Sequence, residues 1–474
     1  MKKWWYVWCF FGIAATFWLS RWIWQQPFDI QYLESIFERS QWRIPNSKTV
    51  IADNELYQVA GWRIIGSQDF YTTNPEVPPA GKYLYGMSER LLGSPYWASA
   101  LLYVGSLSLF GWLTLSLPVA ARKWAWLWWI WNPLLSLQVS QTMLDLPQLF
   151  FLLLHLVALW QWSNEKSPMR KWSWIVVAGI GLGLFSASKI GLFVPVILLA
   201  DGLYFWRKKQ FRWIWPLGFT VGLTYILTYA PYVLSHGPID WLKAQKWMVH
   251  FYAISRVKPL YGMPILTALT GLYHGWWKQG WTWTREWNVL WAISLVVALS
   301  HWWNIFRQKS WLRLNGWHDY ILVLFSGLGL AFCLIPFWSR YFLILLPLGI
   351  LLAARALYTR PKLCLLVTGI IVTQWWISMI PTPSERLQFA LSTWRNQQWE
   401  QLYEFLPPDK KAALSREEFI TQKTGTPIPT TVSYTLPWPW QTTQQADFYI
   451  RSMAGFTTQT FEATRVGSQW YLDF

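Results

Sequence analysis

The chain has 474 residues, of which 54% are hydrophobic and only 13% are charged. Its formal net charge is +17, but the Lys and Arg residues gather in short clusters between long apolar runs, as in the cytoplasmic loops of membrane proteins. The composition therefore excludes an ordinary soluble enzyme and argues against a nucleic-acid partner.

Several apolar runs reach the length of about 20 residues that a helix needs to cross the hydrocarbon core of a membrane. The first, residues 4–20, lacks a small-residue cleavage site, so we interpret it as a retained helix rather than a signal peptide. Ten further runs lie near residues 95–117, 124–139, 146–162, 172–188, 190–206, 213–234, 289–303, 320–337, 341–357 and 363–380. The sequence thus predicts a polytopic α-helical membrane protein with about eleven transmembrane helices.

The basic clusters predict the orientation of this protein. They are Lys2-Lys3, Arg122-Lys123, Lys166 with Arg170-Lys171, residues 207–212, residues 307–313, and Arg360 with Lys362. All of them fall on one side if the eleven helices are divided correctly, and the positive-inside rule makes that side cytoplasmic. We therefore expect an inner-membrane protein with a cytoplasmic N-terminus and two external loops, residues 24–94 and 235–288. An enzyme on the external face would need a lipid-carried substrate, because no nucleotide donor is normally available there.

The segment after residue 380 changes in character. Charged amphipathic stretches come first, and Ser415 with Glu418 forms a capping box that predicts the start of a helix. Four stretches within residues 433–474 then alternate as strands do. We expect residues 1–380 to form the transmembrane domain and residues 381–474 a small extracytoplasmic α+β domain, similar in element order to an NTF2-like cone. The tail has no charged cluster at catalytic spacing, so binding or structural support is its favoured role.

Residues 53–84 form the only long polar segment in the first half of the chain. Asp53 and Glu55 precede an amphipathic run, and Glu76 stands two positions before Pro78-Pro79 and ahead of Gly81-Lys82. Acidic side chains beside a membrane repel anionic headgroups, so such a cluster indicates a functional role. For Asp53 the alternative is a helix N-cap, a position that Asp favours.

These motifs resemble those of the polyprenol-phosphate-dependent glycosyltransferases of the GT-C fold, the class that holds the protein O-mannosyltransferases and the lipid A aminoarabinose transferases. The stretch from Asp53 to Tyr57 is similar to the Asp-Glu pair and Tyr of that class, although Asn54 replaces the usual Glu. Residues 74–82 fit an acidic residue before Pro-Pro with Gly-Lys after it. The resemblance covers about the first 380 residues.

Further matches follow in the same order along the chain. Asp145 looks like the Leu-Asp motif of the class, Lys189 like its Ser-Lys break between two helices, and Arg340-Tyr341 like its Arg-Tyr pair. His250, in a loop where relatives keep a Met and a His, is the weakest match, because LYGMP replaces the usual Ser-Pro-Trp-Trp.

The resemblance implies inverting transfer of a hexosyl or pentosyl group from a polyprenyl phosphate to an acceptor hydroxyl. Asp53 is expected to take the hydroxyl proton, with Glu55 as the supporting carboxylate. Basic side chains are expected to stabilise the departing phosphate, although snorkelling to the membrane interface is the alternative for each of them. The expected substrate-binding residues are Tyr57, Glu76, Lys82, Asp145, Lys189, Arg340 and Tyr341.

No cofactor is required by this reading, although Glu76 and His250 could hold a divalent metal. The three cysteines and His155 lie in apolar runs, so all four are expected to be packing residues.

The rival interpretation is a non-enzymatic membrane protein or a transporter, in which Asp145 and Lys189 would mark a translocation path. A lipid-linked oligosaccharide ligase is a third possibility. The acceptor, whether glycan, lipid or protein, is not given by the sequence.

Overall fold

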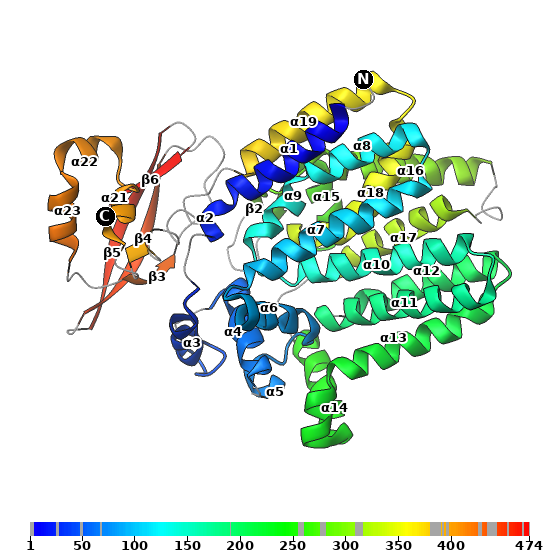
Figure 1. Ribbon diagram of the computed structural model, residues 1–474, viewed down its shortest axis with the longest axis horizontal. Helices are drawn as coiled ribbons and strands as arrows, with labels where there is room; N and C mark the ends of the chain where they lie inside the picture. The colour runs from blue at the N-terminus through cyan, green and yellow to red at the C-terminus, as the bar shows by residue number, and fades with distance from the viewer. Residues whose placement is uncertain are drawn as a thin grey trace. The chain divides into compact units, whose positions relative to one another are not determined.

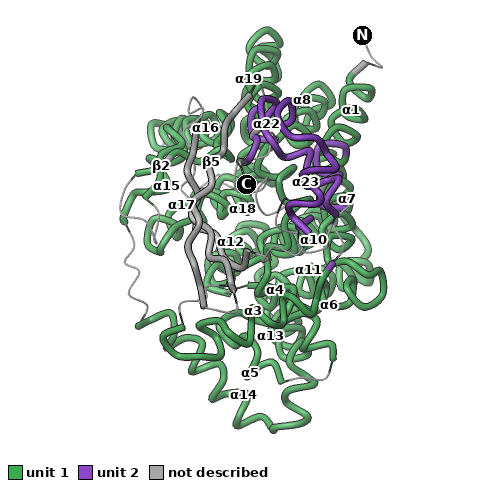
Figure 2. Tube along the Cα trace, turned by 90° about the vertical axis from the view of Figure 1, so that its left-hand side faces the viewer, with its two compact units in different colours: residues 1–17, 29–376 green, residues 18–28, 377–474 purple. Residues whose placement is uncertain are grey.

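The computed structural model describes residues 4–24, 28–47, 51–66, 69–189, 191–254, 260–274, 281–308, 316–379, 390, 393–394, 398–424, 429–433, 443–452, 455–466 and 469–473. The chain divides into two compact units, Met1–Phe17 with Asp29–Trp376 and Trp18–Phe28 with Ile377–Phe474 (Figure 2). The larger unit is helical, and the smaller one combines short helices with a sheet.

Each of the eleven apolar runs holds a helix (Figure 1). These helices are α1 (Trp4–Leu19), α7 (Tyr96–Leu113), α8 (Val119–Ile130), α10 (Asp145–Asn164), α11 (Pro168–Ser188), α12 (Val194–Arg207), α13 (Ile214–Thr228), α16 (Val289–Arg307), α17 (Trp317–Phe332), α18 (Phe342–Leu357) and α19 (Pro361–Met379). Within the described parts of the chain, six helices are long and apolar enough to cross a membrane, or seven if a pair bent by 100° counts as one. The prediction of a helical membrane fold is confirmed, but its count of eleven crossings is not.

Local sequence explains part of this difference. The apolar run 124–139 is interrupted at Asn132, whose Oδ1 accepts hydrogen bonds from the backbone N–H groups of Leu134 and Leu135. A new short helix, α9 (Pro133–Leu137), therefore begins there with Pro at its first position, where the missing N–H costs nothing. The run then yields two short helices instead of one long one.

The centre of the larger unit is built around α10 and α18. Helix α10 packs against α7, α11 and α18, and α18 is buried along most of its length. At the α10–α11 contact the backbones approach closely, because a Cβ on Gly181 would lie 2.8 Å from the backbone nitrogen of His155. This close packing fixes the ends of the central helices, so that side chains at those ends can form a site with a defined geometry.

The segments between the apolar runs of the larger unit also form helices and one strand pair. These are α3 (Ile30–Arg39), α4 (Asp53–Ile65), α5 (Phe70–Thr73), α6 (Ala80–Leu92), α14 (Ala230–Ala253), α15 (Met263–Thr270) and the antiparallel pair β1 (Leu272–His274) and β2 (Trp281–Trp283). Helices α4 and α6 touch through glycine, since a Cβ on Gly61 would lie 2.6 Å from the carbonyl oxygen of Lys82. Regions expected from the sequence to be external loops are therefore largely structured.

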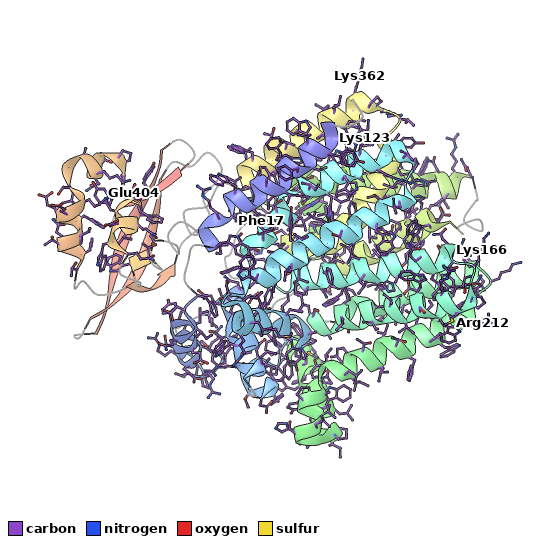
Figure 3. All side chains as sticks on the ribbon, viewed as in Figure 1. Phe17, Lys123, Lys166, Arg212, Lys362 and Glu404 are labelled. Atoms are coloured by element: carbon purple, nitrogen blue, oxygen red, sulfur yellow. The ribbon has the colours of Figure 1, made fainter. Side chains whose placement is uncertain are left out.

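Four basic residues show how charge is distributed over the helical unit. Lys123, Lys166, Arg212 and Lys362 lie along one edge of the bundle, and α4 to α6 lie at the opposite edge (Figure 3). This arrangement agrees with basic loops that share one side. The assignment of that side to the cytoplasm stays a prediction from the sequence.

The smaller unit contains α2 (Arg21–Trp24), α21 (Trp399–Tyr403), α22 (Pro408–Ala413) and α23 (Arg416–Lys423), followed by β3 (Pro429–Ser433), β4 (Thr443–Ser452), β5 (Gly455–Val466) and β6 (Gln469–Asp473). The strands form one antiparallel sheet in the order β3-β4-β5-β6. Ser415 caps α23 as predicted, since its Oγ accepts from Glu418 N and its own N–H donates to the Glu418 carboxylate. The first expected strand, residues 433–438, lies mostly outside the described residues, and the NTF2-like shape stays a prediction.

Candidate active site

Asp53 is the first residue of α4, but it does not cap the helix. The N-cap is Ala52, and Glu55 reaches back to it, with Oε2 accepting from the Ala52 N–H at 3.4 Å. Asp53 instead uses Oδ2 to accept a 2.7 Å hydrogen bond from Arg340 Nη2, while 43% of its side chain stays exposed. The structure thus gives the capping role to Glu55, while Asp53 pairs with Arg340 and keeps part of its side chain exposed.

Arg340 links two carboxylates from distant parts of the chain. It lies on η6 (Ser339–Tyr341), a single 3-10 turn that leads into α18. Its Nη2 contacts Asp53, its Nε lies 3.4 Å from Asp145 Oδ2, and its Nη1 lies 3.5 Å from Met143 Sδ. A planar guanidinium with five donors is well suited to this bridging position.

Asp145 and Lys189 extend this chain of charges. Asp145 begins α10 and is buried, and its Oδ1 accepts from Lys189 Nζ at 2.6 Å. Lys189 directly follows the end of α11, and its ammonium lies 4.3 Å from the ring centroid of Tyr341. The ends of α4, α10, α11 and η6 therefore converge on alternating charges, in the order Asp53, Arg340, Asp145, Lys189.

Glu76 lies near this cluster in the turn between α5 and α6. Asn74 Nδ2 lies 3.5 Å from Glu76 Oε1, and the side chain is half-buried. Burial raises the pKa of Glu76 to about 7, the negative charge of Asp53 adds to this, and Lys82 opposes it. A carboxyl group that titrates near neutral pH is suited to accept a proton.

Lys82 has a different environment from the one expected for a phosphate ligand. Its side chain is fully buried, and Nζ donates to the carbonyl oxygens of Asn74 at 2.6 Å and Val77 at 2.7 Å. The ammonium also lies 5.0 Å from the ring centroid of Phe70. Burial lowers the pKa of Lys82, and Glu76 opposes that shift. In this arrangement Lys82 holds the turn that carries Glu76.

The remaining predicted residues lie around this centre or outside it. Tyr57 is buried on α4, one turn after Asp53, and Tyr341 is beside Lys189. His250 is exposed on α14. Among the described residues no group of three or more His, Cys, Asp or Glu side chains could hold a metal ion. A metal held by Glu76 and His250 therefore gains no third ligand here and stays a prediction.

The sequence interpretation missed Glu286. This residue lies between β2 and α16, and its Oε2 accepts a 2.7 Å hydrogen bond from Ser339 Oγ, the neighbour of Arg340. Burial raises the pKa of Glu286, and the hydrogen bond from Ser339 opposes that shift. The only signal in the sequence is a short polar stretch, TREWN at residues 284–288, in an otherwise apolar region.

An apolar cavity of about 270 Å³ opens among α15, α16, α17 and α18. Trp291 and Phe342 line it, and their rings stack with centroids 4.1 Å apart. One lining residue, Phe342, directly follows the turn that carries Arg340.

No protein-family model matches the chain, and a search of curated proteins found no match. Among solved structures, the chain is similar to ArnT from Cupriavidus metallidurans bound to undecaprenyl phosphate, with 12% identity over 88% of this chain and 70% of that one and a TM-score of 0.50. It is also similar to ArnT from the same organism in the apo state, with 12% identity over 80% and 79% of the two chains and a TM-score of 0.44. ArnT is a GT-C lipid A aminoarabinose transferase. The first likeness confirms the GT-C resemblance at the level of the fold.

Proposed function

We propose that this protein is a membrane glycosyltransferase that moves a sugar from a polyprenyl-phosphate donor to an acceptor on the extracytoplasmic face. The observation that carries the proposal is the convergence of Asp53, Arg340, Asp145 and Lys189 at the helix ends of a GT-C-like bundle. In support, the structure of ArnT with the same fold was solved with undecaprenyl phosphate bound.

The chemistry requires a base and a stabilised leaving group. An acceptor hydroxyl attacks the anomeric carbon of the donor, a new C–O bond forms, and the bond from that carbon to the phosphate oxygen breaks. The hydroxyl proton passes to a carboxylate, for which we propose Asp53, since its side chain is partly exposed at the centre of the cluster. Glu76 is the second candidate, because its pKa of about 7 suits a general base at neutral pH.

The leaving polyprenyl phosphate needs positive charge that is already in place. Arg340 and Lys189 supply it from η6 and from the end of α11, and both are held by Asp145. Groups that are fixed before the reaction stabilise developing charge without the cost of reorganising solvent. A donor phosphate that binds Arg340 would either displace the Asp53 carboxylate from the guanidinium or bind beside it.

The lipid part of the donor needs an apolar surface near these cations. The cavity among α15 to α18 offers one, because its lining is almost entirely apolar and includes Phe342, which directly follows the turn that carries Arg340. We propose that the first isoprene units of the carrier occupy it while the phosphate stays at Arg340 and Lys189. The sugar and the acceptor are left open by this assignment.

The proposal can be tested by measuring the lipid-linked sugars in cells that lack this protein. Loss of the transferase should cause a polyprenyl-phosphate-linked sugar to accumulate, since its consumption stops while its synthesis continues. The unchanged chain should clear the accumulated lipid, and Asp53→Asn should not. Lipid-linked sugars that stay at wild-type levels after deletion would show that the proposed function is wrong.

A further inference from the structure

Arg340 depends on a turn that has little stability of its own. The turn η6 (Ser339–Tyr341) is a three-residue 3-10 helix. The Tyr341 N–H donates to the Trp338 carbonyl at 2.9 Å, and the Phe342 N–H donates to the Ser339 carbonyl. Such short 3-10 pieces have poor hydrogen-bond geometry. Contacts from other segments must therefore fix the backbone position of Arg340.

One of these contacts comes from Glu286. Ser339 is buried, and its Oγ donates to Glu286 Oε2 at 2.7 Å. A buried hydrogen bond of this kind fixes both partners, because losing one leaves the other unsatisfied. The contact lies one residue from Arg340, so a shift of Ser339 would move the guanidinium as well.

The segment that carries Glu286 is itself well anchored. Trp287 Nε1 donates to the Ala268 carbonyl of α15 at 3.0 Å, and Asn288 Oδ1 accepts from the Leu290 N–H and so caps α16. The Thr284 N–H donates to the Gly271 carbonyl at 2.8 Å. Because α15 and the start of α16 hold this segment, Glu286 can locate the turn of Ser339 instead of following it.

We propose that Glu286 is a positioning residue of the active site, which fixes Arg340 through Ser339. The inference rests on the proposed function, since it takes Arg340 to bind the donor phosphate. Arg340 is then held directly at its side chain by Asp53 and Asp145, and indirectly by Glu286 through the neighbouring Ser339. The same contact joins the segment before α16 to the turn before α18, the two helices whose Trp291 and Phe342 line the apolar cavity.

The test measures equilibrium binding of undecaprenyl phosphate to the full chain in lipid nanodiscs. Glu286→Ala and Ser339→Ala should each weaken binding about tenfold, which corresponds to about 1.4 kcal/mol. The double variant should be no weaker than either single one, because both changes remove the same interaction. Glu286→Gln should restore most of the affinity, since its amide oxygen still accepts the hydrogen bond from Ser339.

Two controls separate positioning from general destabilisation. Glu89→Gln changes another buried carboxyl group, on α6, and should leave the affinity unchanged. In a chain that already carries Arg340→Gln, Glu286→Ala should have no further effect, whereas a purely structural role would weaken binding in both backgrounds. If Arg340→Gln weakens binding and Glu286→Ala does not, the inference is overturned and the proposed function stands. If the unchanged chain does not bind undecaprenyl phosphate, both are overturned.

Discussion

Asp53 and Glu55 are two positions apart, yet the structure gives them different roles. Asp53→Asn keeps an oxygen that can accept from Arg340 but removes the basic group. We expect sugar transfer to fall by about 10²- to 10⁴-fold, the usual effect of losing general-base catalysis. Glu55→Gln should stay close to the wild-type rate, since Glu55 contacts the backbone of Ala52. The measurement is the initial rate of transfer by membranes that contain equal amounts of each variant.

The opposite result would be equally informative. An active Asp53→Asn with an inactive Glu55→Gln would mean that the motif has been assigned one register wrong. If both variants stay active, Glu76 is the better candidate for the base.

The titration of Glu76 gives a prediction in pH. Its pKa is raised from 4.5 to about 7, mainly by burial. If the ionised form accepts the proton, the transfer rate should rise as the pH increases through about 7, and Glu76→Gln should remove that rise.

The raised pKa of Glu76 also affects the stability of the folded protein. The contribution of this group to the free energy of unfolding is fully present below about pH 4.5 and is lost as the pH rises through 7. Thermal unfolding of Glu76→Gln should therefore depend less on pH between 5 and 7 than that of the unchanged chain.

For single residues, the sequence identified members of the candidate site but not which of them contact one another. Asp53, Asp145, Lys189 and Arg340 were found from their local motifs, and the structure brings all four together. Their pairing depends on tertiary structure, since Asp53 and Arg340 are 287 positions apart. Glu286 was missed for the same reason, because only its contact with the turn beside Arg340 distinguishes it.

Helices α10, α11, α12 and α17 meet at a polar contact that the sequence did not predict. His155, expected to be a packing residue, lies with Nε2 3.4 Å from Asp201 Oδ2 and Nδ1 3.0 Å from the Ala178 carbonyl. A carbonyl only accepts, so Nδ1 carries a proton and Nε2 faces the carboxylate. Tyr320 donates to the other oxygen of Asp201 at 2.8 Å. One group from each of four helices is thus joined in the dry interior.

This contact predicts a strong coupling between two substitutions. Asp201→Leu alone should destabilise the protein by about 1–3 kcal/mol, because it leaves the buried Tyr320 hydroxyl without its acceptor and the His155 ring without its carboxylate neighbour. The double variant His155→Leu with Asp201→Leu should lose less than the sum of the two single variants. The measurement is the unfolding midpoint of the detergent-solubilised protein, with the exposed Ser108→Ala of α7 as a control. Additive losses would show that the two side chains do not form a functional pair.

At the level of secondary structure, the hydropathy of the sequence predicted which segments form helices but not where those helices end. All eleven apolar runs contain a helix, whereas the run 213–234 stops at Thr228 and the chain turns by 100° into α14. The expected loop 235–288 also contains most of α14, all of α15 and the β1–β2 pair. Hydropathy does not mark these features, because an amphipathic helix mixes apolar and polar residues and a bend can leave an apolar run uninterrupted.

The topology of the whole molecule is the broadest prediction. The described helices give six or seven crossings by length and composition, and the two counts place the termini differently. An even number leaves both ends on one side, and an odd number separates them. The odd count, whether seven or the predicted eleven, is the one that the expected cytoplasmic N-terminus and external C-terminal segment require.

Labelling with a membrane-impermeant thiol reagent in intact cells distinguishes these counts. In a chain whose three cysteines, Cys9, Cys333 and Cys364, are replaced by Ser, single new cysteines report on each loop. We expect Ser235→Cys and a cysteine added after Phe474 to react from outside, and Ser167→Cys, beside the basic residue Lys166, to react only after the cells are opened. A protected C-terminal cysteine together with an accessible Ser235→Cys would support an even count. Accessible Ser167→Cys in intact cells would reverse the orientation and place the cluster around Asp53 on the cytoplasmic face, where a nucleotide-linked donor becomes available.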